Sequence, residues 1–299
     1  MADSYKAAMQ AAIDAAATAE ALDDKTAVAL AGGFYKDYTT GQTVVTFGPG
    51  WNEIERLDAE GGYDGIALFH AASGSLVVVN RGTEGLHSYA DWMENIGAAL
   101  FNAPGPQMDS ALQLLLDALR KVDQTAVKQL LITGHSLGGA LADAQGALAQ
   151  SLFAANSLTC PPLRVVGVAS AGFAHAAEAL AAARHLTPSP DASHFITHYV
   201  RAEDYVPHHP GRSVFGRDQT VASIYEARRE PQPGPHSQGM YEWDCIADGL
   251  RQHDADLYFA FYDQPGSSHI WYSTQADSYT VALGARPSWR RGLQPPDNY

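Results

Sequence analysis

The sequence feature that most constrains the fold is a serine set among glycines directly after an apolar run. Leucine and isoleucine fill positions 130–132, the sequence Gly-His-Ser-Leu-Gly-Gly occupies 134–139, and an alanine-rich stretch at helical spacing follows. This order predicts a buried strand, a tight turn and a helix, the context in which Gly-x-Ser-x-Gly forms a nucleophile elbow. Side chains on either side of Ser136 would collide with the strand and the helix, so glycine is needed there. The elbow glycines are Gly134, Gly138 and Gly139.

The whole string resembles the signature of the class 3 lipases, a branch of the α/β-hydrolases. A second similar motif lies upstream, where the apolar run 76–79 ends in Asn-Arg-Gly-Thr at 80–83. Such a continuous run predicts a strand that is buried on both faces. In this family the strand ends at an oxyanion-hole donor, so the resemblance implies that Thr83 supplies one through its backbone N–H. Leu137, the residue after the serine, would supply the other.

A third similar motif provides an acidic residue. The stretch 196–201 predicts a strand, and Glu203-Asp204-Tyr-Val-Pro follows it. Class 3 lipases carry their triad aspartate before such a Val-Pro, so the resemblance implies that Asp204 is the catalytic carboxylate. Glu203 would point the other way along an extended backbone. The order serine, aspartate, histidine is also the order found in α/β-hydrolases.

That order leaves five histidines after Asp204 as candidates for the base. They are His208, His209, His236, His253 and His269. The first two lie too close to Asp204 to reach back from a separate loop, and His253 has the pattern of a solvated helix end. We favour His236, because we expect a strand before its loop and a helix after it, and because it resembles the His-Ser-x-x-x-Tyr string of bacterial-type family members. The alternative base is His269, whose His-x-Trp-Tyr context is similar to that of the fungal lipases.

These motifs predict one α/β-hydrolase domain over residues 1–299, with a mostly parallel central sheet and helices on both faces. A division of the chain into two domains would separate Ser136 from Asp204. Residues 252–299 exceed what a minimal hydrolase needs. We expect a β-rich C-terminal extension there, with a β-hairpin built from the aromatic segments 258–262 and 269–272.

Residues 85–105 form a candidate lid, because class 3 lipases carry an amphipathic lid directly after the oxyanion strand. Large apolar side chains recur along this segment. A helix with one ordinary core-facing stripe has the same pattern, and both interpretations stay open. A true lid would expose its apolar face on opening and would give rate activation at lipid interfaces.

Together the motifs predict a serine hydrolase that cleaves carboxylic esters, as a lipase or carboxylesterase, through an acyl-enzyme. Ser136, Asp204 and His236 would form the triad, because an imidazole must take the serine proton and a carboxylate must fix the imidazole tautomer. A phospholipase A and a catalytically silent interaction protein on the same scaffold are the alternatives. We expect no cofactor and no metal. His194 and His198 are spaced like ligands, but no third ligand stands near them, and partly buried strand histidines explain the pair better.

Charge and hydropathy limit the partners. Nineteen basic and 33 acidic residues give a formal net charge of −14 without a basic run, which argues against a nucleic-acid partner. We expect a small-molecule or lipid ester substrate, with at most transient contact with a lipid interface. No apolar run approaches the ~18 residues of a membrane span, and no signal-peptide pattern is present. We therefore expect a cytoplasmic chain, or export without a cleaved signal peptide, with Cys160 and Cys245 as unpaired thiols.

Overall fold

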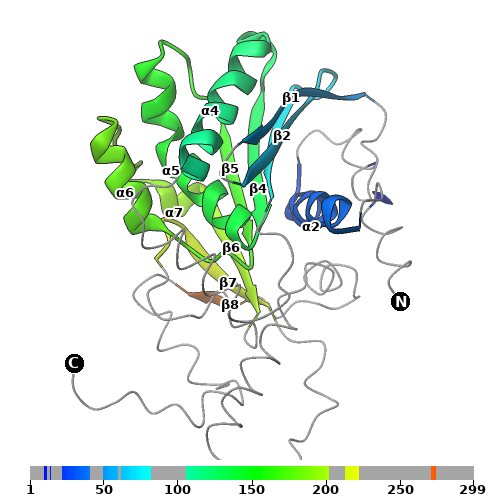
Figure 1. Cartoon of the computed structure of the whole chain (residues 1–299). Coiled ribbons are helices and arrows are strands. Elements are labelled where there is room, and N and C mark those ends of the chain that lie inside the picture. The colour runs from blue at the N-terminus through cyan, green and yellow to red at the C-terminus, as the bar shows by residue number, and fades with distance from the viewer. Residues whose placement is uncertain are drawn as a thin grey trace, which may run out of the picture.

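The centre of the computed structural model is a single sheet of eight strands, which lie side by side in chain order (Figure 1). The described residues are 10, 11, 14, 22–40, 50–59, 62–81, 106–201, 213–221 and 271–273. The strands are β1 (Trp51–Ala59), β2 (Tyr63–His70), β3 (Ser75–Asn80), β4 (Gln129–His135), β5 (Leu163–Val168), β6 (Ile196–Arg201), β7 (Arg217–Val221) and β8 (Trp271–Ser273). The helices are α2 (Asp24–Thr40), α4 (Pro106–Lys121), α5 (Leu137–Ala155), α6 (Ala174–Ala183), α7 (Ala192–Phe195) and the short 3-10 helix η1 (Gln124–Ala126).

The middle of the sheet is parallel, which confirms the prediction. β3 to β7 run in the same direction, whereas β1, β2 and β3 form an antiparallel meander and β8 pairs antiparallel with β7. The register aligns the carboxyl ends of three strands, because Asn80 pairs with Gly134, and Gly134 pairs with Gly167. In open α/β sheets, ligands bind outside this edge.

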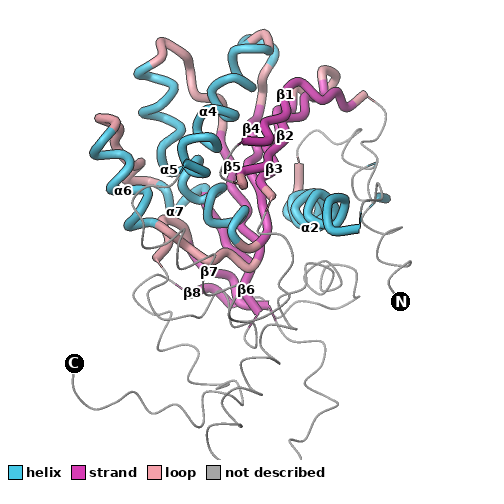
Figure 2. The backbone as a smooth tube through the Cα atoms, viewed as in Figure 1, coloured by secondary structure: helices cyan, strands magenta, loops and turns pink. Residues whose placement is uncertain are grey.

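The order of the strands decides where the helices lie. Crossovers between parallel strands are right-handed, so a sheet that grows in one direction places its crossover helices on one face. α4, α5 and α6 cover one face accordingly, and α2, which precedes the first strand, covers the other (Figure 1, Figure 2). The prediction of helices on both faces is thus confirmed, and among the described helices it is α2 that closes the second face.

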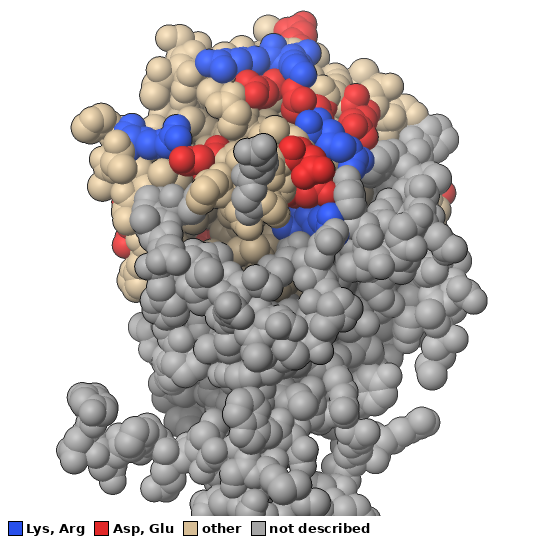
Figure 3. All heavy atoms as spheres, viewed as in Figure 1, with Lys and Arg blue, Asp and Glu red and all other residues tan. Residues whose placement is uncertain are grey.

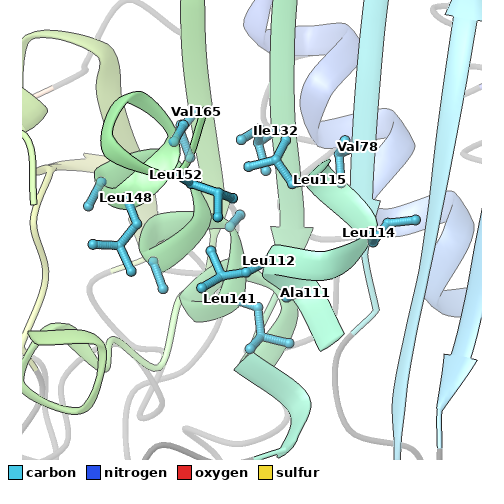
Figure 4. Close-up of a cluster of buried hydrophobic side chains, with 14 of the residues drawn as sticks. Val78, Ala111, Leu112, Leu114, Leu115, Ile132, Leu141, Leu148, Leu152 and Val165 are labelled. Carbon is cyan, nitrogen blue, oxygen red and sulfur yellow. The ribbon is translucent and has the colours of Figure 1, made fainter. Parts of the chain in front are cut away.

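Both faces of the central strands are buried, which explains their continuous apolar runs. In β3, Leu76 and Val78 belong to the core on the side of α4 and α5, while Val77 and Val79 belong to the core under α2. Figure 4 shows the first of these cores, where leucines of α4 and α5 meet Ile132 of β4. Full burial of one such side chain contributes about 1.5–3 kcal/mol.

The N-terminal end of α2 is fastened to the sheet by polar side chains. The carboxylate of Asp24 pairs with the guanidinium of Arg164 on β5 and accepts a hydrogen bond from the hydroxyl of Tyr199 on β6. Asp23 caps the helix, because its Oδ1 accepts from the N–H of Thr26 at 2.8 Å. These contacts fix the direction in which α2 crosses the sheet.

The described part of the C-terminal region is β8. Residues 271–273 extend the central sheet by pairing with β7. Residues 258–262, which the sequence predicts as their hairpin partner, lie outside the described residues, so the hairpin stays a prediction.

The described surface carries charges of both signs. On the face drawn in Figure 3, basic side chains lie beside acidic ones, and Arg120, for example, lies 3.6 Å from Asp117. None of the helices in the described ranges is both long enough and apolar enough to cross a membrane.

Candidate active site

Ser136 stands at the junction of β4 and α5 in a backbone conformation that side chains rarely adopt. β4 ends at His135, α5 begins at Leu137, and Ser136 between them has a φ of 59° and a ψ of −121°. A non-glycine residue in such a region stores about 1–3 kcal/mol of strain, which persists only where the surrounding structure fixes it. The strand, the tight turn and the helix that the sequence predicts are all present here.

Two glycines let the elbow lie against the end of β3. A Cβ on Gly134 would stand 2.3 Å from the carbonyl oxygen of Gly138, and a Cβ on Gly138 would stand 2.3 Å from the carbonyl oxygen of Asn80. Both clashes are with backbone atoms, which cannot swing aside as a flexible side chain can. At Gly139 the contact is looser, because a Cβ there would meet the Cβ of Ser170 at 3.1 Å. The first two glycines are therefore required by contact, and the third less strictly.

Four hydrogen bonds hold the backbone of Ser136. Its N–H donates to the carbonyl oxygen of Val168 at 2.9 Å. Its own carbonyl oxygen accepts from the N–H groups of Gly139, Ala140 and Ala171 at 3.1, 3.2 and 3.3 Å. The hydroxyl does not cap α5, although serine is a favoured N-cap residue, so the helix makes no use of it.

The first turn of α5 lies directly beside the serine. The first N–H groups of a helix have no acceptor within the helix, and they lie at the positive end of its dipole. Leu137 provides the first of these groups, and it is buried. A fixed N–H in this place is suited to stabilise negative charge that develops on a substrate oxygen.

A chain of neutral side chains ties the end of β3 to α5 and α4. The hydroxyl of Tyr63 donates to Oδ1 of Asn80 at 2.8 Å, and Nδ2 of Asn80 donates to Oε1 of Gln145 at 2.6 Å. Gln145 in turn donates to the carbonyl oxygen of Ala111 at 2.6 Å. The three side chains are fully buried, so each needs these partners to offset its desolvation. The sequence motifs do not single out Tyr63 or Gln145, because nothing local marks them.

Arg81, the residue after β3, is buried in an ion pair with β2. Its Nη1 lies 3.2 Å from Oδ2 of Asp64, and its N–H donates to the carbonyl oxygen of Asp64 at 2.9 Å. Burial first, and the negative charge of Asp64 second, raise the pKa of Tyr63 well above its ordinary value of 10.0. The end of β3 is thus held by the side-chain hydrogen bonds of Asn80 and by the ion pair of Arg81.

The two histidines that are spaced like metal ligands lie in different environments. His198 is on β6, fully buried, with Nε2 3.1 Å from Oδ1 of Asp143. His194 lies on α7, largely exposed, 3.8 Å from Asp191. The expectation of two partly buried strand histidines is therefore wrong for His194, because residues 192–195 form a helical turn before the strand. No group of three potential metal ligands occurs within the described ranges.

A second strained turn lies beside the elbow. Ala169, which follows β5, has a φ of 50° and is fully buried. Its N–H donates to the carbonyl oxygen of Tyr199 at 2.9 Å, and Ala171, two residues later, donates to Ser136 as described. The sequence gives no signal for this turn, since alanine rarely takes a positive φ.

The structure shows only part of the predicted site. Ser136, Leu137 and the three elbow glycines lie together, while four predicted residues lie outside the described residues: Thr83, Asp204, His236 and His269. β3 ends three positions before Thr83 and β6 ends three positions before Asp204. The roles of these four residues, and the candidate lid at 85–105, stay predictions. Cys160 forms no disulfide, and burial raises the pKa of its thiol to about 11; Cys245 is also outside the described residues.

Residues 77–214 match the model of a protein family described as class 3 lipase. The match runs from β3 through the elbow and past the Asp204 motif. Over these residues, which are a little less than half of the chain, the sequence is that of a class 3 lipase. The match makes the chain a carboxylic ester hydrolase with an α/β-hydrolase fold, and the family acts on lipid esters. The narrower prediction of a bacterial-type member is not borne out by the match.

Several solved lipase structures are similar to this chain at low identity. Lipase II from Rhizopus niveus is 16% identical, with a TM-score of 0.44 over 76% of this chain and 91% of that chain. A triacylglycerol lipase from Penicillium expansum is 13% identical, with a TM-score of 0.42 over 76% and 89%. Lip2 lipase from Yarrowia lipolytica is 18% identical, with a TM-score of 0.40 over 66% and 77%. No curated protein sequence matches the chain, and the assignment rests on the family match.

Proposed function

We propose that this lipase cleaves its esters through an acyl-enzyme on Ser136, with Asp204 and His236 completing the triad. The observation that carries the proposal is the strained backbone of Ser136 at the carboxyl edge of the sheet, with φ at 59°. A serine that merely joined a strand to a helix would take an ordinary conformation and cap the helix. Strain that is kept at such a position points to chemistry.

The reaction transfers an acyl group twice. The hydroxyl oxygen of Ser136 attacks the ester carbonyl carbon while the imidazole of His236 accepts the hydroxyl proton. The bond to the alcohol oxygen breaks, the alcohol leaves with that proton, and the acyl group remains on the serine. Water then attacks the carbonyl carbon of the acyl-enzyme while the same histidine takes a proton from the water. The bond to the serine oxygen breaks, the histidine returns the proton to that oxygen, and the carboxylic acid leaves.

The negative charge of each tetrahedral intermediate needs donors that are in place beforehand. We assign this role to the N–H groups of Leu137 and Thr83, and one such donor is worth roughly 3 kcal/mol in the transition state. The first belongs to the start of α5. The hydrogen-bond chain from Asn80 to Gln145 supports the second, because it fixes the strand end from which the chain continues to Thr83.

Ester turnover by the wild-type chain and by Ser136→Ala tests the proposal. We expect the wild type to hydrolyse p-nitrophenyl esters and the variant to lose a factor of about 10⁴ or more while keeping its fold. A fluorophosphonate probe should label Ser136, as peptide mapping by mass spectrometry would show. Labelling at another serine would overturn the assignment. A folded wild type without any turnover would instead support a catalytically silent interaction protein.

A substrate series narrows the class of ester. Acyl chains from acetyl to palmitoyl, each offered below and above the micelle concentration, separate a carboxylesterase from a lipase. Rate activation above that concentration would favour a moving lid at 85–105. Phosphatidylcholine in the same micelles tests the phospholipase A alternative.

A further inference from the structure

Helix α5 carries a buried carboxylate about two turns after Ser136. Asp143 has no exposed surface, and each of its oxygens has a partner. Oδ1 lies 3.1 Å from Nε2 of His198 on β6. Oδ2 accepts from the backbone N–H of Phe215 at 3.1 Å, just before β7. One side chain therefore joins the helix of the nucleophile to two segments on the far side of β5.

The surroundings fix how the His198 ring lies. A carboxylate oxygen accepts, so Nε2 of His198 carries the proton of its hydrogen bond to Asp143. Nδ1 of His198 is buried without a hydrogen-bond partner among the described residues. Gly167 makes room for the ring, because a Cβ there would stand 2.4 Å from Nδ1. The ring is thus held by a contact on one side and a directional bond on the other.

Stability alone does not explain this pair. Burying a carboxylate and an imidazole costs desolvation free energy, and apolar side chains of similar volume are often at least as stabilising in such places. The α5 side of β5 and β6 is otherwise packed by apolar groups such as Val165 and Ile196. Apolar contacts allow neighbouring elements to slide, whereas a hydrogen bond requires a set distance and angle. What the pair adds is a fixed position.

We propose that Asp143 is a positioning residue, which sets the distance between Ser136 and the carboxyl end of β6. β6 ends at Arg201, three positions before Asp204 in the sequence, so an error in the position of β6 would be passed on to the carboxylate of the triad. The proposal rests on the proposed function, since only a triad requires this distance. Displacements near 1 Å far from the chemistry are enough to cost about 10²-fold in rate.

Three variants on one helix test the proposal. Asp143→Ala removes both bonds. Asp143→Asn keeps an oxygen that accepts from the N–H of Phe215. Its amide nitrogen then faces Nε2 of His198 and can donate to it when the ring proton lies on Nδ1. Leu148→Ala is the matched control, because Leu148 is equally buried on α5 but lies in the apolar core. For each we would measure Tm, kcat and KM on a p-nitrophenyl ester, and the rate of fluorophosphonate labelling.

We expect Asp143→Ala to lower kcat and the labelling rate at least about tenfold while KM changes by less than about threefold. Leu148→Ala should lower Tm by as much or more, yet keep kcat within about threefold. Asp143→Asn should lower Tm but restore kcat to within about threefold of the wild type. Equal kcat losses in Asp143→Ala and Leu148→Ala at equal Tm loss would reduce the residue to a structural role and overturn the proposal.

A second pair of variants decides the matter if Asp143→Ala does not fold. His198→Gln keeps a side-chain N–H for Asp143 and should retain kcat, whereas His198→Leu removes the donor and should lose about tenfold. Equal kcat values in these two variants would also overturn the proposal. If the wild type shows no ester turnover, both the proposed function and the positioning role of Asp143 are wrong. If the wild type is active and Asp143→Ala has the same kcat, only the positioning role is wrong.

Discussion

Two serines of this lipase lie at opposite ends of the central sheet and differ in what holds them. Ser73, in the turn between β2 and β3, has its hydroxyl oxygen 2.8 Å from Nδ1 of His70. Ser136, after β4, lies on strained backbone beside the first turn of a long helix. A search for serine–histidine hydrogen bonds alone would select Ser73, whereas backbone strain and location on the sheet select Ser136.

The hydrogen bonds of Ser73 have a structural purpose. Its backbone N–H also donates to Nδ1 of His70, at 3.3 Å, so Nδ1 is an acceptor and the hydroxyl donates to it. Ser75 lies 2.7 Å from the hydroxyl of Ser73 and accepts from Nε2 of Gln129 at 2.8 Å. Gln129 Oε1 accepts from the N–H of Leu22 at 3.3 Å. These hydrogen bonds run from His70 through Ser73, Ser75 and Gln129 to Leu22, and we call them the amino-end chain. The chain binds the hairpin of β2 and β3 to β4 and to the residues before α2. Ser73 itself has no positive φ.

The largest expected effect separates the two serines directly. Ser136→Ala should lower ester turnover by about 10⁴-fold or more with the fold kept, because the acyl acceptor is lost. Ser73→Ala should leave kcat within about twofold, because its hydroxyl only orients a turn. Steady-state kinetics on one ester preparation checks both. The assignment of the two serines would be wrong if Ser73→Ala, rather than Ser136→Ala, abolished ester turnover.

The base of Ser136 should come from a distant part of the sequence, unlike the local His70 of Ser73. His236→Ala should abolish measurable turnover, with a loss of about 10⁴-fold, whereas His269→Ala should keep kcat within about tenfold. kcat measurements on both variants, with circular dichroism as the control for folding, test this. The reverse pattern would make His269 the base and leave the rest of the mechanism unchanged.

Ser136 should also differ from Ser73 in that a carboxylate, that of Asp204, accepts a hydrogen bond from its catalytic histidine. Asp204→Asn should lower kcat by about 10³-fold or more, because an amide presents the wrong partner to the imidazole N–H. Glu203→Gln is the matched control on the neighbouring residue and should stay within about threefold. A silent Asp204→Asn beside an inactive Glu203→Gln would show that the wrong carboxylate was chosen.

The amino-end chain should matter for stability rather than for rate. Ser75 is fully buried, and Ser75→Ala leaves Gln129 and Ser73 each without one hydrogen-bond partner. We expect a loss of about 1–3 kcal/mol in the free energy of unfolding, with kcat within about twofold of the wild type. Urea unfolding and ester kinetics on the same sample measure the two quantities. A large loss of kcat at unchanged stability would contradict the structural role.

At the carboxyl end of the sheet, Tyr63, Asn80 and Gln145 form another buried chain of hydrogen bonds. Substitution of Tyr63 has the smallest effect that we predict. Burial, then Asp64, raise the pKa of Tyr63 in the folded state. The stability from the neutral phenol is therefore complete below the unfolded pKa of about 10 and is lost as pH rises above it. In urea titrations between about pH 8 and pH 11, Tyr63→Phe should lose less stability with rising pH than the wild type. Parallel losses in both proteins would show that Tyr63 does not contribute.

Local sequence predicts the elements that carry the serine, and little of what positions them. The apolar runs of β3 and β4 and the glycines at 134 and 138 suffice for the elbow, because buried parallel strands and tight turns have strong local signatures. β1 has no such signature. Its residues are partly buried or exposed without a regular alternation, none is fully buried, and several are charged. The pair of Asp143 and His198 is 55 positions apart in the sequence, so only the folded sheet brings it together.

The order of the strands has a consequence for how the chain folds. Every strand pairs with the strand made just before it, so a growing sheet can add each new strand at its free edge as synthesis proceeds. Pairing between strands that are neighbours in the sequence closes shorter loops than pairing across the sheet would, which lowers the entropy cost of closure. The backbone of Ser136 nevertheless depends on Val168 and Ala171. The reactive serine is therefore assembled only after β5 has joined, when more than half of the chain has left the ribosome.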